Sequence, residues 1–243
     1  MQAWGLTDPG NVREQNQDDF RIVKMDDDVL LCVVCDGMGG ARSGNVASKL
    51  AGEVFSEEVK RSFNREMTPQ EVERVLRSAV TLANISVYEH SQLSEEYKGM
   101  GTTLVAALIY EKGAVVINVG DSRAYHIDPD GVSCITVDHS VVELMVQRGE
   151  LTHEQAKSHP SKNLITRAVG TTPQVLADVF YVDLGKNDCL LLCSDGLSNE
   201  MDDQEILFEV AHGARKDDCC ERLLEIAKER GAPDNVTSIL IAP

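Results

Sequence analysis

The order of strand-like and helix-like segments is the feature that most limits how this chain can fold. Strand-like segments come in consecutive runs, and helical segments come in pairs. A parallel sheet needs a long crossover, usually a helix, between successive strands, so this order disfavours it. Neighbouring strands can instead pair as antiparallel hairpins. We therefore predict an α+β fold, with two antiparallel sheets packed face to face and helix pairs outside them.

Apolar periodicity gives the expected elements. One helix is predicted by apolar residues at helical spacing over 47–59, and another begins at Thr68-Pro69-Gln70-Glu71, a capping box with proline in the first turn. Further helices are expected at 141–147, 204–211 and 219–229. Because no linker, repeat or low-complexity tract interrupts the chain, we predict a single domain over 1–243. The expected strands are 20–24, 29–35, 103–110, 114–119, 123–127, 132–136, 175–182, 189–193 and 236–241.

The charge balance excludes some classes of protein. The chain has 40 acidic and 23 basic residues, a formal net charge of −17. Nucleic-acid binders usually carry a basic surface, so we expect no nucleic-acid partner. No segment approaches the ~18 consecutive apolar residues of a membrane span, so we expect no membrane association. The first residues lack a basic start and an apolar stretch, which predicts a cytoplasmic protein.

Seven cysteines are scattered along the chain. An odd number without a secretory signal argues against a disulfide framework. Cys32 and Cys35 have the C-x-x-C spacing, but they lie in an apolar run and no second cysteine pair or histidine cluster accompanies them. We predict that they belong to the core and do not form a zinc or redox site.

Five aspartates lie at the ends of predicted strands. Asp36, Asp121 and Asp195 each follow an apolar strand, whereas Asp18 and Asp234 precede one. Any one of them is compatible with a simple turn. Five together favour convergence at one rim of a sheet sandwich, where their repulsion must be neutralised by cations. Oxygen ligands suit Mg²⁺ or Mn²⁺ better than zinc.

Two further residues fit this chemistry. Gly37 has no Cβ, so its carbonyl can approach a metal closely. Arg13 has the planar fork that matches phosphate oxygens, although taken alone it fits an ordinary surface position better. A pair of metals can lower the pKa of a water molecule and stabilise a phosphoryl transition state.

These residues carry a resemblance to a known family. The ordered motifs are similar to those of the PPM family, the type 2C protein phosphatases, in its short bacterial form, and they cover nearly the whole chain. They are Arg13-x-x-Asn16-Gln17-Asp18, Val34-Cys35-Asp36-Gly37-Met38-Gly39-Gly40, Gly99-Met100-Gly101-Thr102-Thr103, Asn118-Val119-Gly120-Asp121-Ser122-Arg123, Asp138-His139-Ser140, His159-Pro160-x-x-Asn163-x-Ile165-Thr166-Arg167, Ser194-Asp195-Gly196-Leu197 and Asp234-Asn235-Val236-Thr237.

The resemblance implies an α-β-β-α sandwich with two tightly bound Mn²⁺ or Mg²⁺ ions. By position, Asp36 bridges both metals, and Asp195 and Asp234 complete one coordination sphere. The Gly37 carbonyl serves the other metal, and Asp18 acts mostly through metal-bound water.

The resemblance also implies a weaker third metal at Asp121 and Asp195. Arg13 binds the substrate phosphate, and a metal-bridging water attacks phosphorus with no phosphoenzyme. The implied substrates are phosphoproteins, with a bacterial Ser/Thr kinase and its targets as partners. The region 139–167 corresponds to the family's flap beside the active site.

One departure concerns acid catalysis. Met38 stands where some family members carry a proposed histidine acid, so we name no protein general acid. His139 and His159 are expected to make structural hydrogen bonds. Two alternatives remain open: a pseudophosphatase that only binds phosphoproteins, and a phosphohydrolase that acts on small phosphoesters.

Overall fold

The computed structural model describes residues 1–111, 113–128, 131–213 and 215–242. Its strands form two antiparallel sheets. The first has the order β1 (Gln2–Asp8), β11 (Val236–Ala242), β10 (Cys189–Cys193), β7 (Arg123–Asp128) and β8 (Gly131–Cys134). The second has the order β2 (Asp18–Asp26), β3 (Val29–Met38), β5 (Leu104–Tyr110), β6 (Gly113–Val119) and β9 (Asp178–Val182), and the short β4 (Gly101–Thr102) pairs with the end of β3.

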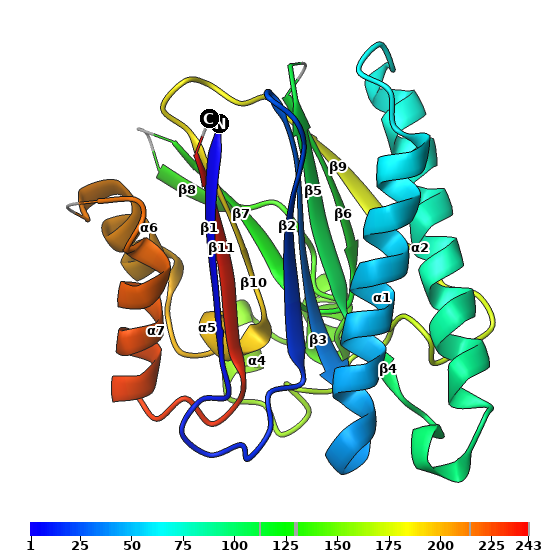
Figure 1. Ribbon diagram of the computed structural model, residues 1–243. Coiled ribbons are helices and arrows are strands. Elements are labelled where there is room, and N and C mark those ends of the chain that lie inside the picture. Colours follow the sequence, from blue (N-terminus) through cyan, green and yellow to red (C-terminus); the bar gives the residue numbers. More distant parts are fainter. Residues whose placement is uncertain (112, 129–130, 214, 243) are drawn as a thin grey trace.

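Helices cover the outer face of each sheet, which gives four layers (Figure 1). One pair lies over the second sheet and the other over the first, on the opposite side of the molecule. The order of layers is therefore α-β-β-α, as predicted. The helices are α1 (Gly40–Ser62), α2 (Pro69–Ser91), α3 (Val141–Gln147), α4 (His153–Lys157), α5 (Asp195–Ser198), α6 (Asp203–His212), α7 (Cys219–Glu229) and a 3₁₀ turn, η1 (Glu95–Tyr97).

Each central strand buries both faces, which explains its unbroken apolar run. In β3, Cys32 and Val34 face the layer between the sheets, while Leu31, Val33 and Cys35 face α1 and α2. Side chains alternate along a strand, so the C-x-x-C pair lies on opposite faces of the sheet. All seven cysteines are free, and burial raises the pKa of Cys32 and Cys35. The predicted core role is confirmed.

Local signals placed most elements correctly. The Thr68 hydroxyl accepts the backbone N–H of Glu71, and the Glu71 carboxylate accepts the backbone N–H of Thr68, so the predicted capping box begins α2. Strand β1 was missed because its residues are only partly buried and show no clear alternation. Gly5 occupies its centre because a Cβ there would lie 2.6 Å from the Phe20 ring.

The flap region contains α3 and α4 and is closed at its base. Ser140 and Ile165 form an isolated antiparallel β-bridge, and the backbone N–H of Thr166 donates to the carbonyl of His139 at 2.7 Å. The sequence predicted α3 but left the rest of this region as a polar stretch. Within the part of the chain that the structure describes, no helix combines the length and apolar character needed to cross a membrane.

Candidate metal centre

Strand pairing places Asp18 opposite Asp36. The register of β2 and β3 matches these two residues directly, and such partners have Cβ atoms about 4.5–5.5 Å apart. Asp18 lies inside β2 as its first residue, whereas the sequence placed it before the strand. Burial and the neighbouring carboxylate of Asp18 raise the pKa of Asp36 well above its usual range. The fold therefore brings two like charges together in a protected position.

Hydrogen bonds to Thr103 hold the end of β3. The Asp36 N–H donates to Thr103 Oγ1 at 2.9 Å, and the Thr103 N–H donates back to the Asp36 carbonyl at 2.8 Å. A Cβ on Gly37 would lie 2.1 Å from the Gly44 carbonyl and 2.6 Å from that of Gln17. The glycine is thus required for close packing of α1 on β3. That the Gly37 carbonyl also binds a metal stays a prediction.

Asp195 and Asp234 lie next to strands of the other sheet. Asp195 is the first residue of α5, directly beyond β10, and Asp234 lies just before β11, the partner of β10. A Cβ on Gly196 would lie 1.9 Å from the Asn235 carbonyl, so glycine allows these two segments to meet. Burial and the charge of Asp234 raise the pKa of Asp195, while hydrogen bonds to Asp36 and Asn199 oppose that change.

Hydroxyl groups join Asp18 to the opposite sheet. Ser194 Oγ donates to Asp18 Oδ2 at 2.8 Å, and Thr237 Oγ1 donates to the same oxygen at 2.5 Å. The carboxylate is only 4% exposed, and burial raises the pKa of Asp18 to about 7 despite these two bonds. Its Oδ1 atom is buried without a hydrogen-bond partner among the described residues. An unsatisfied carboxylate oxygen is what a cation or its water requires.

Asp121 approaches the same cluster from the turn between β6 and β7. Burial, followed by the charges of Asp195 and Asp138, raises the pKa of Asp121 to about 8. Arg123 pairs with both oxygens of Asp138, at 2.9 and 2.7 Å. Arg123 is thereby held beside Asp121, and its charge lowers the pKa of Asp121 without offsetting the effect of burial.

Arg13 lies at the edge of the cluster and contacts Asp234. Its Nη2 atom is 2.7 Å from Asp234 Oδ2, and its side chain is 55% exposed. Within the described residues, no three acidic, histidine or cysteine side chains surround a common ion position as they stand. The aspartates nevertheless raise one another's pKa, so they are close enough to interact. Asp18 accepts hydrogen bonds from Ser194 and Thr237, and Asp234 accepts one from Arg13.

His139 connects the flap to this cluster through structural hydrogen bonds. Its Nδ1 accepts the Gly120 N–H at 3.0 Å, and its Nε2 lies 3.1 Å from Asp178 Oδ2. Nε2 must therefore carry the proton, and burial lowers the pKa of His139. The Nδ1 atom of His159 accepts the backbone N–H of Ser161.

Asn235 is a positioning residue to which the sequence analysis assigned no role. Its Nδ2 donates to the carbonyls of Pro9 and Gln15, and its Oδ1 accepts the Gln17 N–H. It therefore holds the loop that carries Arg13. Ser194 and Thr237 were missed in the same way, and their only signal was that they share the quoted motifs with Asp195 and Asp234.

The cluster has the chemistry of a divalent-cation site. All donors are oxygens, the buried carboxylates repel one another, and one carboxylate oxygen is unsatisfied. Mg²⁺ and Mn²⁺ prefer such oxygen sets, and their charge would relieve the repulsion. The residues present therefore fit these metals.

Comparisons with known proteins agree with this fold. Residues 11–240 match the family model described as Protein phosphatase 2C. The serine/threonine phosphatase stp of Listeria innocua is 36% identical over 244 residues, covering 99% of this chain and 95% of its own. The crystal structure of Stp1 from Staphylococcus aureus has a TM-score of 0.90 and 40% identity, covering 99% of this chain and 94% of that one.

A second solved structure contains metal. It is the catalytic domain of the serine threonine protein phosphatase PstP in complex with two manganese ions, with a TM-score of 0.85 and 29% identity, covering 98% of this chain and 96% of that one. The shared architecture is that of metal-dependent phosphatases with two packed sheets. This chain belongs to the protein phosphatase 2C family.

Proposed function

We infer that this chain is a metal-dependent protein serine/threonine phosphatase that hydrolyses phosphoesters on phosphoproteins. One observation carries the inference. Asp18 and Asp36 from one sheet meet Asp195 and Asp234 from the other, with burial and mutual repulsion raising the pKa of Asp18, Asp36 and Asp195. The named phosphatases that match nearly the full chain support the same activity.

We propose that the cluster holds two divalent cations, Mn²⁺ or Mg²⁺. Asp36 lies centrally enough to feel the charges of Asp18, Asp195, Asp121 and Asp234, which suits it to bridge both ions. Asp195 and Asp234 would serve one ion and the Gly37 carbonyl the other, and Asp18 would act through water. Asp121, together with Asp195, would hold a weaker third cation.

The bound cations would stabilise charge on the phosphoryl group and lower the pKa of the water that attacks phosphorus directly. The role of Arg13 follows from its exposure and its ion pair. A cation bound by Asp234 would weaken the attraction between that carboxylate and the Arg13 guanidinium. The Arg13 side chain would then be free to bind two phosphate oxygens with its planar fork.

Met38 cannot supply a proton to the leaving group, because a thioether has no titratable hydrogen. Within the proposal, the leaving group is therefore protonated from the region of Asp121 rather than by a side chain at position 38. We also propose that the protein opposes a Ser/Thr kinase. In the same proposal it acts in the cytoplasm, and residues 1–243 form one domain.

The test compares substrates with and without metal. We expect the protein to hydrolyse phosphoserine and phosphothreonine peptides with Mn²⁺, to lose activity in EDTA and to regain it when Mn²⁺ returns. Full activity in metal-free protein would exclude the proposed centre. Faster hydrolysis of nucleotides than of phosphopeptides would indicate a small-molecule phosphohydrolase, and metal binding without turnover would indicate a phosphoprotein-binding module.

A further inference from the structure

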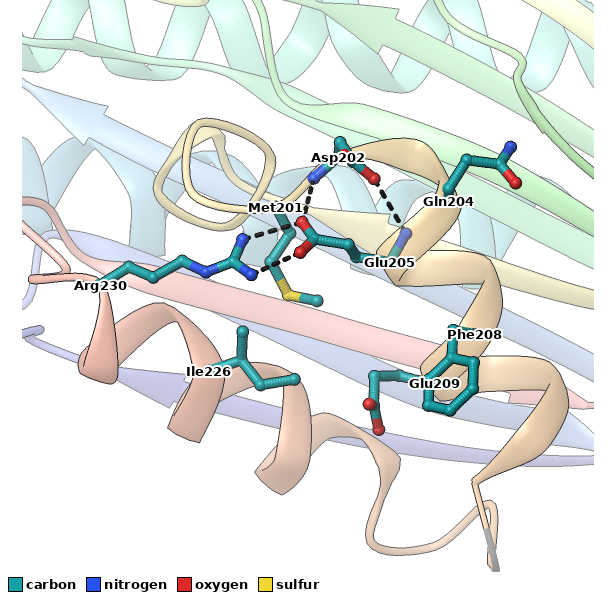
Figure 2. A pocket seen from close by; sticks show the side chains of 8 residues that line it. All are labelled: Met201, Asp202, Gln204, Glu205, Phe208, Glu209, Ile226 and Arg230. Carbon is teal, nitrogen blue, oxygen red and sulfur yellow. Dashed lines mark hydrogen bonds and ion pairs between the residues drawn. The ribbon is translucent and has the colours of Figure 1, made fainter.

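A groove separate from the aspartate cluster lies between α6 and α7. It has a volume of about 300 Å³ and is lined by apolar and acidic side chains (Figure 2). The lining residues are Met201, Asp202, Gln204, Glu205, Phe208, Glu209, Ile226 and Arg230. Its floor is apolar because Met201 is buried and Ile226 is half-buried where the helices pack.

Phe208 is exposed at one end of this groove. Its side chain is 61% exposed, although the same helix buries Ile206 and Val210 in the core. Exposing a large aromatic ring forgoes the stabilisation that burial would provide. An exposed ring beside a groove is a feature of protein interaction sites, where aromatic residues are enriched.

The opposite end of the groove is closed by a charged pair. Arg230 donates to both oxygens of Glu205, at 2.8 and 2.5 Å, and to the Glu200 carbonyl (Figure 2). Hydrogen bonding to Arg230 lowers the pKa of Glu205 to about 2, so the pair stays charged. Since Arg230 lies at the end of α7, it ties the segment after Asp195 to the segment before Asp234.

The charge around the groove limits what can bind there. The lining has three acidic residues, Asp202, Glu205 and Glu209, and one basic residue, Arg230, within a chain of net charge −17. Glu205 pairs with Arg230 and Glu209 with Arg222, whereas Asp202 has no ion pair among the described residues. A second copy of this protein, an anionic membrane or a nucleic acid would be repelled. A segment with positive charges flanking an apolar side chain matches both the acidic rim and the apolar floor.

We propose that the α6–α7 groove is a docking site for a basic peptide segment with one large apolar side chain. The apolar side chain packs between Met201, Ile226 and Phe208. Flanking lysines or arginines pair with Asp202 and with neighbouring acids on the rim. The proposal does not depend on catalysis, because none of these side chains belongs to the aspartate cluster.

The test measures binding of a short fluorescent peptide with a central tryptophan flanked by lysines. Mn²⁺ is present throughout, so that the aspartate cluster does not itself attract the basic peptide. Phe208→Lys is compared with Leu93→Lys, since Leu93 is 71% exposed elsewhere and both changes add one positive charge. Phe208→Ala, which leaves the charge unchanged, is the second variant.

We expect saturable binding to the unchanged protein and a Kd raised about tenfold or more by Phe208→Lys, which equals about 1.4 kcal/mol. Phe208→Ala should weaken binding severalfold, and Leu93→Lys by less than about twofold. Replacing the peptide's lysines with glutamates should abolish binding. Equal affinities for all three variants, inhibition of phosphatase activity by the peptide, or dimerisation of the protein through Phe208 would each overturn the proposal.

Discussion

Thr237 donates a 2.5 Å hydrogen bond from its Oγ1 atom to Oδ2 of Asp18, and this contact joins the two sheets inside the candidate metal centre. Because the hydroxyl hydrogen of Thr237 is used there, Thr7 must donate to Thr237 Oγ1, 2.6 Å away. Asn16 Nδ2 in turn donates to Thr7 at 2.8 Å. This directional chain ends on a carboxylate and supports its ionised form.

Thr237→Val removes the last donor of that chain. We expect the free energy of unfolding in Mn²⁺ to fall by about 1.5–3 kcal/mol, as for a hydrogen bond to a charged group. Thr7→Val is the control and should cost only about 0.5–1.5 kcal/mol, because Thr237 still reaches Asp18. Urea unfolding measures both. A larger loss in the control would show that the contact with Asp18 is unimportant.

The metal-free protein should become less stable as pH rises. The folded state keeps the protons of Asp18 and Asp121 until pH values of about 7 and 8, whereas the unfolded chain loses them near the ordinary aspartate pKa of 3.8. Between these values the folded state binds more protons, so the free energy of unfolding falls as pH increases. Saturating Mn²⁺ should weaken or reverse this trend, because cations bind the deprotonated carboxylates.

Urea titrations in EDTA between pH 5 and 8 test this expectation. Asp121→Asn is the matched control, since it removes one of the raised groups and should flatten the slope. Stability that rises through this range in EDTA would contradict the cause assigned to the pKa changes.

Arg13→Ala should mainly raise KM. The guanidinium is exposed and reaches Asp234, so it can turn to a phosphate when cations occupy the cluster. A smaller decrease in kcat is expected if the contact tightens in the transition state. Arg13→Lys keeps the charge but loses the planar fork, so its KM should lie between those of the unchanged protein and Arg13→Ala. Unchanged KM and unchanged phosphate inhibition would make Arg13 a surface residue.

Asp121→Ala should separate two kinds of substrate. The two tightly bound metals should remain, while turnover falls more on phosphopeptides than on p-nitrophenyl phosphate. A serine alkoxide needs a proton to leave, whereas nitrophenolate does not, and Met38 cannot provide one. Equal losses on both substrates would argue against proton donation from this region, and loss of all metal would place Asp121 in the main site.

The layers and the chemistry of the centre could be predicted from local patterns. Strand runs, the Thr68 capping box and the aspartates at strand ends are each encoded within a few residues. The contacts that need partners distant in sequence were not predictable. Thr237 meets Asp18, and Asn235 meets Gln15, only after two sheets have packed. The assignment of Gly37 to metal approach stays a prediction, and the structure adds a packing role against Gly44 that the sequence did not reveal.

The account depends most directly on Asp36, where charges from both sheets meet. Calorimetric titration with Mn²⁺, done beside turnover measurements on the unchanged protein and Asp36→Asn, tests this role. We expect two tightly bound ions in the unchanged protein, at least one lost in the variant, and a decrease of kcat by orders of magnitude. In EDTA the variant should be as stable as the unchanged protein or more so, because repulsion is relieved. Two tightly bound ions and near-normal turnover in a folded Asp36→Asn protein would contradict the proposed centre.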